Sequence, residues 1–261
     1  MVSWYLGTVG FSYKEWSGVF YPAGMPARSY LAHYSQVFNG VELDSTFYGT
    51  PPSERVRQWA SLVPETFKFC VKTPRQITHE LELVGVQKPM ETFVETMRLL
   101  GDKLGAILIQ LPPQFSAAKV ETVARFLEDL PAGVQYALEF RNRSWFTPET
   151  AALLRNHQVC WVATEYLDFP DQIEPTTDFL YIRWLGRHGQ FKEKNQEQID
   201  ITPRLGWWWE QLQGHLDQVQ TVYGFFNNDF AGYSPATCNR FKTLIGLPVA
   251  ASHVPQQGKL F

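Results

Sequence analysis

The sequence predicts an α/β fold, a closed (β/α)8 TIM-type barrel that occupies residues 1–261 as one domain. A chain of 261 residues with 44% hydrophobic content can bury a large core, and no Gly/Ser/Pro-rich linker divides it. Short β-rich apolar runs recur along it, nearly all followed by helical periodicity, which is the pattern of parallel strands joined by crossover helices. Eight such units fit the typical barrel length of about 250 residues.

The predicted strands follow from these apolar runs, which match the near-continuous hydrophobicity of strands buried on both faces. They cover residues 4–10, 40–46, 67–73, 106–111, 136–141, 159–166, 179–186 and 221–229. An open doubly wound sheet is the alternative fold. It would call for a phosphate-binding glycine motif after the first strand, and neither G-x-G-x-x-G nor G-x-x-x-x-G-K-S/T occurs in the sequence.

Helices are predicted between the strands by apolar residues at helical spacing and by start signals. Thr147 before Pro148 and Ser234 before Pro235 each place an N-cap residue ahead of a proline at the first helical position. The crossover between the sixth and seventh strands, residues 167–178, contains two prolines and little periodicity, so it is predicted to be irregular. Apolar helical faces are formed by Phe93, Val94, Met97 and Leu100, and by Val120, Val123, Phe126, Leu127 and Leu130.

The composition narrows the classes of protein to which the chain could belong. A formal charge of −3 provides no general attraction to nucleic acid or to an anionic membrane. Cys70, Cys160 and Cys238 are few and widely spaced, which favours reduced, buried thiols over a disulfide framework. The sequence has no secretory leader and no apolar run long enough to span a membrane, so we expect a cytoplasmic protein.

Polar residues lie at the C-terminal ends of the predicted strands, which meet at one mouth of a barrel where binding and catalytic groups collect. Side chains two apart on a strand share a face, so Glu42 lies with Asp44, and Glu139 with Arg141. Buried charges must be paired or must await a ligand, so a structural ion-pair network is the alternative to a functional site. The further residues at the strand ends are Lys72, Gln110, Thr164, Glu165, Arg183, Asn227, Asn228 and Asp229.

Seven segments resemble, in order and along nearly the whole chain, the domain-of-unknown-function 72 family. They are GFSYKEWSGVFYP, FNGVELDSTFYGTPP, FKFCVKTPRQITH, LGAILIQLPPQF, YALEFRNRSWF, YIRWLGRHG and FFNNDFAGYSPATC. The resemblance implies a TIM-type barrel and no particular reaction. The family's characteristic polar positions fall here on Glu42, Thr46, Tyr48, Lys72, Thr78, His79, Gln110, Glu139, Arg141, Arg183, Asn227, Asn228 and Asp229.

Three chemistries are compatible with these residues. A glycosidase would use Glu42 and Glu139 as its carboxylate pair. Glu42, Glu139, His79 and Asp229 are hard ligands that could hold magnesium or manganese, although no metal-binding motif is present. The favoured interpretation is that these residues line a pocket for an anionic, phosphorylated or carbohydrate-like small molecule. Barrels frequently bind phosphate after the last strands, where the helix starting at Ser234 would direct its free N–H groups to the mouth.

The sequence therefore predicts a small-molecule enzyme of hydrolase, lyase or isomerase type, with no cofactor other than a divalent cation. We assign catalysis to Glu42, Glu139, Asp229 and His79, with Asp229 acting as a base or orienting Arg183. A non-catalytic ligand-binding protein is an alternative. Substrate binding is assigned to Lys72, Gln110, Arg141, Arg183, Asn227, Asn228, Tyr48 and Trp184, the last two as stacking platforms.

The C-terminal segment at about 252–261 provides a different functional hypothesis. It loosely resembles the bacterial sliding-clamp-binding peptide, with Gln257 ahead of Leu260 and Phe261. An extended peptide of this kind can place two apolar anchors in a partner's pocket. In that case the protein would be a nucleic-acid maintenance factor recruited to a sliding clamp.

Overall fold

The structure is a computed structural model that describes residues 2–167 and 169–250. Its centre is a single sheet of nine strands, and every neighbouring pair is parallel. The strands are β1 (Ser3–Val9), β2 (Gly40–Leu43), β3 (Lys68–Lys72), β4 (Leu104–Gln110), β5 (Gln135–Glu139), β6 (Cys160–Trp161), β7 (Ala163–Glu165), β8 (Phe179–Trp184) and β9 (Thr221–Phe226).

The sheet curls into a nearly closed barrel. Its strand order is β6-β5-β4-β3-β2-β1-β9-β8-β7, so β6 and β7 are its two edges. These edges are separated in the chain by Val162 alone, whose N–H still donates to the carbonyl oxygen of Leu138 at 3.0 Å. The single strand predicted at 159–166 is therefore two short strands, because the chain leaves β5 and joins β8 at this residue.

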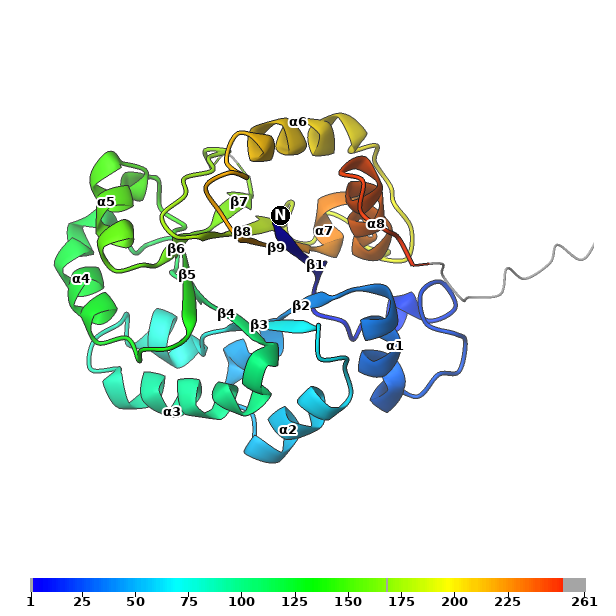
Figure 1. The fold of residues 1–261 in the computed structure, drawn as a ribbon, viewed down its shortest axis with the longest axis horizontal. Coiled ribbons are helices and arrows are strands. Elements are labelled where there is room, and N and C mark those ends of the chain that lie inside the picture. The colour runs from blue at the N-terminus through cyan, green and yellow to red at the C-terminus, as the bar shows by residue number, and fades with distance from the viewer. Residues whose placement is uncertain (1, 168, 251–261) are drawn as a thin grey trace, which may run out of the picture.

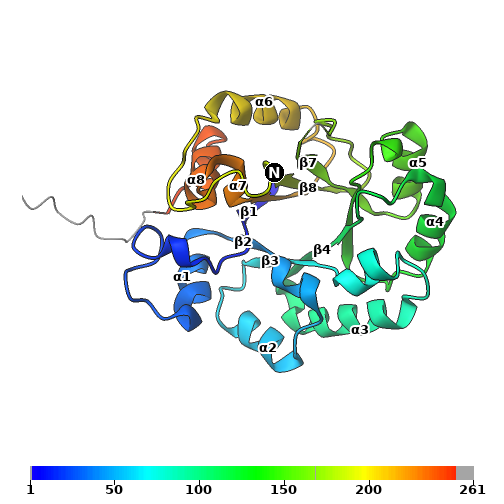
Figure 2. The same ribbon diagram turned by 180° about the vertical axis from the view of Figure 1, so that it is seen from behind.

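Helices surround the strands on the outside, as both views show (Figures 1 and 2). The side chain of Thr147 accepts the N–H of Thr150, which confirms the helix start predicted there. The start predicted at Ser234 is shifted by one residue, since Tyr233 is the N-cap and Ser234 is already helical. The helices are α1 (Tyr30–Val37), α2 (Ser53–Ser61), α3 (Gln87–Met97), α4 (Val120–Glu128), α5 (Pro148–Asn156), α6 (Thr202–Gln213), α7 (Asn228–Ala231) and α8 (Ser234–Leu244).

The barrel interior is filled by side chains of complementary size. Small residues project inward from one side, among them Cys70, Ala106, Ala137 and Cys160, and large aromatic residues fill the space from the opposite side, namely Phe179, Tyr181, Tyr223 and Phe225. Side chains two residues further along a strand face the same way, so the next layer towards the C-terminal ends contains Glu42, Lys72, Glu139 and Arg183. The apolar interior therefore forms the floor below a layer of charged residues.

Several predictions made for the rest of the chain can be compared with the structure. The three cysteines are free and buried. Residues 169–178 form neither helix nor strand, as predicted for the irregular crossover. None of the helices in residues 2–167 and 169–250 is long and apolar enough to cross a membrane. The clamp-binding peptide predicted at Gln257, Leu260 and Phe261 lies outside the described residues.

Candidate functional site

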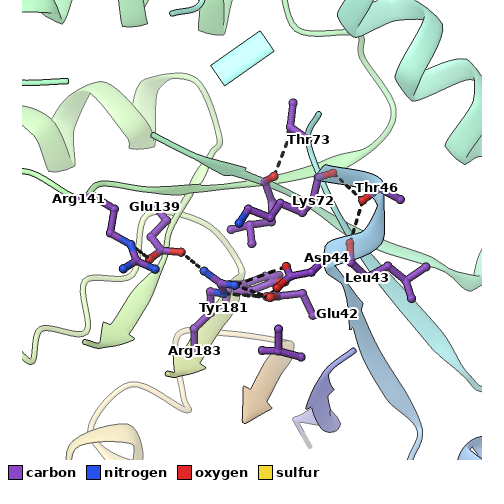
Figure 3. Close-up of polar contacts among 12 residues, drawn as sticks. Glu42, Leu43, Asp44, Thr46, Lys72, Thr73, Glu139, Arg141, Tyr181 and Arg183 are labelled. Atoms are coloured by element: carbon purple, nitrogen blue, oxygen red, sulfur yellow. Dashed lines mark hydrogen bonds and ion pairs between the residues drawn. The ribbon is translucent and has the colours of Figure 1, made fainter. Parts of the chain in front are cut away.

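Arg183 stands at the centre of the charged layer and joins two strands from opposite sides of the barrel (Figure 3). It comes from β8 and is 2% exposed. Its Nε donates to Glu42 Oε2 at 2.9 Å, and its Nη1 donates to Glu139 Oε2 at 2.5 Å. The Tyr181 hydroxyl donates to Glu42 Oε2 at 2.7 Å. We call Glu42, Glu139, Arg141, Tyr181 and Arg183 the ionic cluster.

The second carboxylate of the ionic cluster is shared by two guanidinium groups. Glu139 Oε1 pairs with Nε of Arg141, while its other oxygen accepts from Arg183. The Arg141 guanidinium lies over the Tyr166 ring, 4.0 Å from the ring centre. Glu139 is therefore held on both sides, and Arg141 on one face, before any ligand enters.

The two carboxyl groups have pKa values shifted in opposite directions. Burial raises the pKa of Glu42, although the Arg183 guanidinium opposes that rise. Burial would raise the pKa of Glu139 as well, but Arg141 and Arg183 together outweigh it and lower the pKa. Arg183 stays protonated because Glu139 and Glu42 outweigh the cost of its burial and raise its pKa. The ionic cluster thus contains a carboxylate that is firmly ionised beside one that is more readily protonated.

Lys72 is the last residue of β3 and faces the ionic cluster, yet it is not part of its bonding. It is 9% exposed, and within residues 2–167 and 169–250 its Nζ makes no hydrogen bond or ion pair. Its nearest described partner is the ring of Phe47, whose centre lies 4.2 Å from Nζ. Burial, assisted by the neighbouring Arg183 and opposed by Asp44, lowers the pKa of the Lys72 amine.

Asp44 lies at the edge of the ionic cluster, just after β2 ends at Leu43. Its Oδ1 is 3.7 Å from Arg183 Nη2 and has no hydrogen-bond partner among the described residues. The following short helix η3 (Asp44–Tyr48) is fixed by the buried Thr46, whose Oγ1 lies 2.6 Å from the carbonyl oxygen of Lys72. The Asp44 side chain is 40% exposed and lines a cavity of about 610 Å³.

His79 and Tyr48 lie beside this site rather than in the ionic cluster. His79 belongs to a π-helical turn η4 (Gln76–Glu80), and its Nδ1 is 2.8 Å from Thr78 Oγ1. Its ring centre is 5.0 Å from that of Phe47, the same ring that Lys72 Nζ contacts. Burial and the charges of Lys72 and Arg75 lower the pKa of His79, which favours the neutral imidazole. Tyr48 is 87% exposed.

The structure places one predicted ligand-binding residue, Trp184, away from the mouth of the barrel. Trp184 is fully buried and stacks on Phe226 with ring centres 4.1 Å apart. It is a core residue because it follows the inward-facing Arg183 and therefore points to the helical side of the sheet. Gln110 ends β4 beside Glu139, its partner in the strand register, and among the described residues its side chain makes one long hydrogen bond, from Nε2 to the carbonyl oxygen of Leu111 at 3.4 Å.

The Asn227, Asn228 and Asp229 side chains mainly hold loops and helix ends. Asn227 Oδ1 accepts the N–H of Asp229 at 2.9 Å and so caps α7. Asn228 Oδ1 accepts both the N–H and the hydroxyl of Ser234, at 3.0 and 2.9 Å. The Ser234 N–H that was expected to face the mouth as an anion donor is therefore already satisfied.

Of the two roles predicted for Asp229, the structure shows no contact with Arg183 within residues 2–167 and 169–250, while the role of a base stays a prediction. Its carboxylate accepts the Gly189 N–H at 3.1 Å and pairs with Lys194 Nζ at 3.2 Å. These contacts anchor the loop that follows β8 onto α7. Asp229 is 2% exposed, and its carboxylate is occupied by these contacts with the loop.

Three residues of the site were missed by sequence reasoning. Tyr181 sits two positions before Arg183 and so shares its face, a spacing that could have identified it. Tyr166 ends the sixth predicted strand, but nothing in the sequence pairs it with Arg141. Lys194 lies in a loop without periodicity, so no sequence signal connects it with Asp229.

The four expected metal ligands are not gathered at one point. Glu42 and Glu139 are engaged with Arg183, Asp229 is paired with Lys194, and the His79 ring packs against Phe47. Within residues 2–167 and 169–250, no three His, Cys, Asp or Glu side chains are grouped as a metal site requires.

Comparisons with known proteins agree with the family resemblance. The model of the family described as "Protein of unknown function DUF72" matches residues 5–259. UPF0759 protein YunF of Bacillus subtilis is 35% identical over 256 residues, covering 87% of this chain and 89% of that protein. UPF0759 protein YecE of Escherichia coli is 29% identical over 142 residues, about half of each protein.

Solved structures of the family have the same fold. A DUF72 family protein from Thermotoga maritima superposes with a TM-score of 0.80 at 31% sequence identity, covering 94% of this chain and 99% of its own. A DUF72 family protein from Enterococcus faecalis superposes with a TM-score of 0.71 at 24% identity, over 95% of this chain and 99% of its own.

Proposed function

We propose that this chain, which belongs to the DUF72 family, is a lyase- or isomerase-type enzyme that uses the Lys72 amine on the carbonyl group of an anionic small molecule. The observation that carries the proposal is the state of Lys72 itself. Its amine is almost buried and has no hydrogen bond or ion pair among the described residues, while the acidic groups around it are engaged with arginines.

The surroundings of Lys72 favour a nucleophilic amine. An unprotonated lysine is a nucleophile, and enzymes obtain it by desolvation or by a neighbouring cation. Both conditions are met here, because Lys72 lies under the Phe47 ring and near the permanently charged Arg183. Attack on an aldehyde or ketone forms a carbon–nitrogen bond, and loss of the carbonyl oxygen as water leaves an imine.

The ionic cluster would provide a fixed electrostatic surface for this chemistry. Glu42 accepts hydrogen bonds at both carboxylate oxygens, and Glu139 accepts one from Arg183 and forms an ion pair with Arg141, so Lys72 and His79 are the better candidates for the acid/base role. His79, a neutral imidazole in contact with Phe47, would exchange a proton with the substrate. Arg183 and Arg141 favour an anionic ligand over a cationic one.

We also read β6 and β7 as one strand interrupted at Val162, which makes the barrel the eight-stranded TIM type. The superposition on the Thermotoga maritima protein supports this interpretation. In an eight-stranded barrel, Lys72 and the ionic cluster would lie at the C-terminal mouth, where barrel enzymes bind their substrates.

Imine trapping tests the proposal directly. The protein is incubated with glyoxylate, an anionic aldehyde, and sodium cyanoborohydride, and the modified lysines are identified by peptide mass mapping. We expect the adduct mainly on Lys72, its loss in Lys72→Arg, and no change in Lys88→Arg, which alters an exposed lysine. Equal labelling of the exposed lysines and Lys72 would contradict the proposal.

The pH dependence of labelling gives a second prediction. Because the pKa of Lys72 lies below its ordinary value of 10.5, the reactive neutral amine should appear at lower pH than in a lysine-containing peptide. The labelling rate of Lys72 should therefore rise through a midpoint below 10.5. A midpoint equal to that of the peptide would show that the buried amine is not activated.

A further inference from the structure

We infer that the cavity beside Asp44 binds the phosphate group of the substrate, so that the substrate is a phosphorylated carbonyl compound. The cavity has a volume of about 610 Å³ and lies between the segments that follow β1 and β2 and the helices α1 and α2. The inference rests on the proposed function for the reacting end of the substrate and on separate residues for the phosphate end.

Two arginines carry the inference. Arg28, in the short helix η2 (Ala27–Ser29), and Arg55, in α2, both line the cavity. Both are exposed, and neither guanidinium group has a hydrogen bond or an ion pair to a residue within 2–167 and 169–250. Several other arginines, such as Arg141, Arg183 and Arg204, are paired with carboxylates. Two guanidinium groups left without partners at one cavity offer the forked donors that recognise phosphate.

The rest of the lining suits a short carbon skeleton with polar substituents. The apolar part of the cavity wall is formed by Trp59, Leu62 and Leu31. Hydrogen-bonding groups come from Ser12, Ser45 and Gln58. This combination of apolar wall and a few polar groups is typical of small-molecule sites. The volume of the cavity accommodates a molecule of this size.

Asp44 connects the cavity to the reacting end of the site. It lines the cavity and also lies 3.7 Å from Arg183 Nη2 in the ionic cluster. Its carboxylate contributes to the electrostatic environment of Lys72, which places the two groups close together (Figure 3). Since Asp44 repels a phosphate, the phosphate belongs at the arginine end and the carbonyl carbon at the Lys72 end.

This location replaces the phosphate site expected at the start of α8. There the Ser234 N–H and hydroxyl are bonded to Asn228, and the next residue, Pro235, has no N–H to donate. Ser234 is also fully buried. The guanidinium groups of Arg28 and Arg55 therefore favour an anion site after β1 and β2 over one at Ser234.

Calorimetric titration with inorganic phosphate tests the inference. We expect wild-type protein to bind phosphate more tightly than chloride, and Arg28→Gln and Arg55→Gln each to weaken the affinity about tenfold, as for loss of a charge-assisted contact. The matched control is Arg57→Gln, which removes the same charge from an exposed position of α2 that does not line the cavity. It should bind phosphate within about twofold of wild type.

Two results would overturn the inference: phosphate that binds no better than chloride, or Arg57→Gln that loses as much affinity as Arg55→Gln. The glyoxylate adduct on Lys72 should form unchanged in the control variant Arg57→Gln. Lys72→Arg should still bind phosphate. Wild-type protein that forms the Lys72 adduct but binds no phosphate would refute this inference alone. Wild-type protein that binds phosphate but forms no Lys72 adduct would refute the proposed reaction alone.

Discussion

Replacement of Arg183 by methionine tests how strongly the ionic cluster depends on its central residue. Arg183→Met keeps a long, flexible side chain but removes every donor that Arg183 gives to Glu42 and Glu139, which are 0% and 1% exposed. Removal of one partner from a buried ion pair costs about 3–5 kcal/mol, because the remaining charge stays buried without compensation. Against a total stability of about 5–15 kcal/mol this is a large loss.

Urea unfolding at neutral pH measures the effect as a lower midpoint with an unchanged slope. The control is Arg240→Met, whose side chain is 43% exposed in its pair with Glu197 and should contribute no more than about 1 kcal/mol. If the free energy of unfolding of Arg183→Met were within about 1 kcal/mol of that of wild type, this would refute the expected loss of stability. The ion pairs of Arg183 would then make no net contribution to stability.

The cost of Arg183→Met should also depend on pH. Without Arg183, nothing of comparable size opposes the rise that burial causes in the pKa of Glu42. A carboxyl with a raised folded pKa holds its proton longer in the folded state, so stability falls as pH rises above the ordinary value of 4.5. The difference from wild type should therefore be smallest near pH 4.5 and grow towards neutral pH. A difference that is constant over this range would contradict the assignment to Glu42.

Two further substitutions test local parts of the structure. Tyr181→Phe removes the hydroxyl that donates to Glu42, and it should lower the free energy of unfolding by about 1–2 kcal/mol; an unchanged urea midpoint would contradict that contact. Gly186→Ala places a Cβ 2.1 Å from the carbonyl oxygen of Asp229 at a φ of +67°, whereas at Gly189 (φ +74°) the same atom meets nothing within 4 Å. Gly186→Ala should therefore destabilise the protein clearly more than Gly189→Ala in the same assay, and equal losses would show that only backbone strain matters.

The sequence was sufficient to locate the strands because buried parallel strands are apolar on both faces. The same property explains why the interruption of the strand predicted at 159–166 was not foreseen. The run at 159–166 is apolar throughout, and nothing in it reveals that pairing passes from β5 to β8 at Val162. That change depends on the geometry of closure, which is decided by the whole barrel and not by the local sequence.

The convergence of Glu42, Lys72, Glu139, Arg141 and Arg183 also followed from position, since each stands at the C-terminal end of a strand. What could not be predicted is which partner each side chain takes. The sequence cannot distinguish a free lysine from a paired one, because pairing depends on side chains that are remote in the chain.

Trp184 was assigned to ligand binding and Asp229 to catalysis because of their positions at predicted strand ends. Trp184 lies in the core, because alternate residues at a strand end face the mouth and the helices. Asp229 lies beyond the end of β9, in α7, and its carboxylate pairs with Lys194 of the loop after β8, a contact that no sequence signal reveals.

The ionic cluster has a consequence for any molecule that enters the mouth. Its charged side chains are attached to β2, β5 and β8 and are already held in place by their mutual contacts. The reorganisation free energy is therefore small when a charge develops nearby. Discrimination among ligands then depends on how well their charge fits a rigid template. Adaptation to different ligand sizes is left to the segments around that template, above all the one from Asp44 to Tyr48.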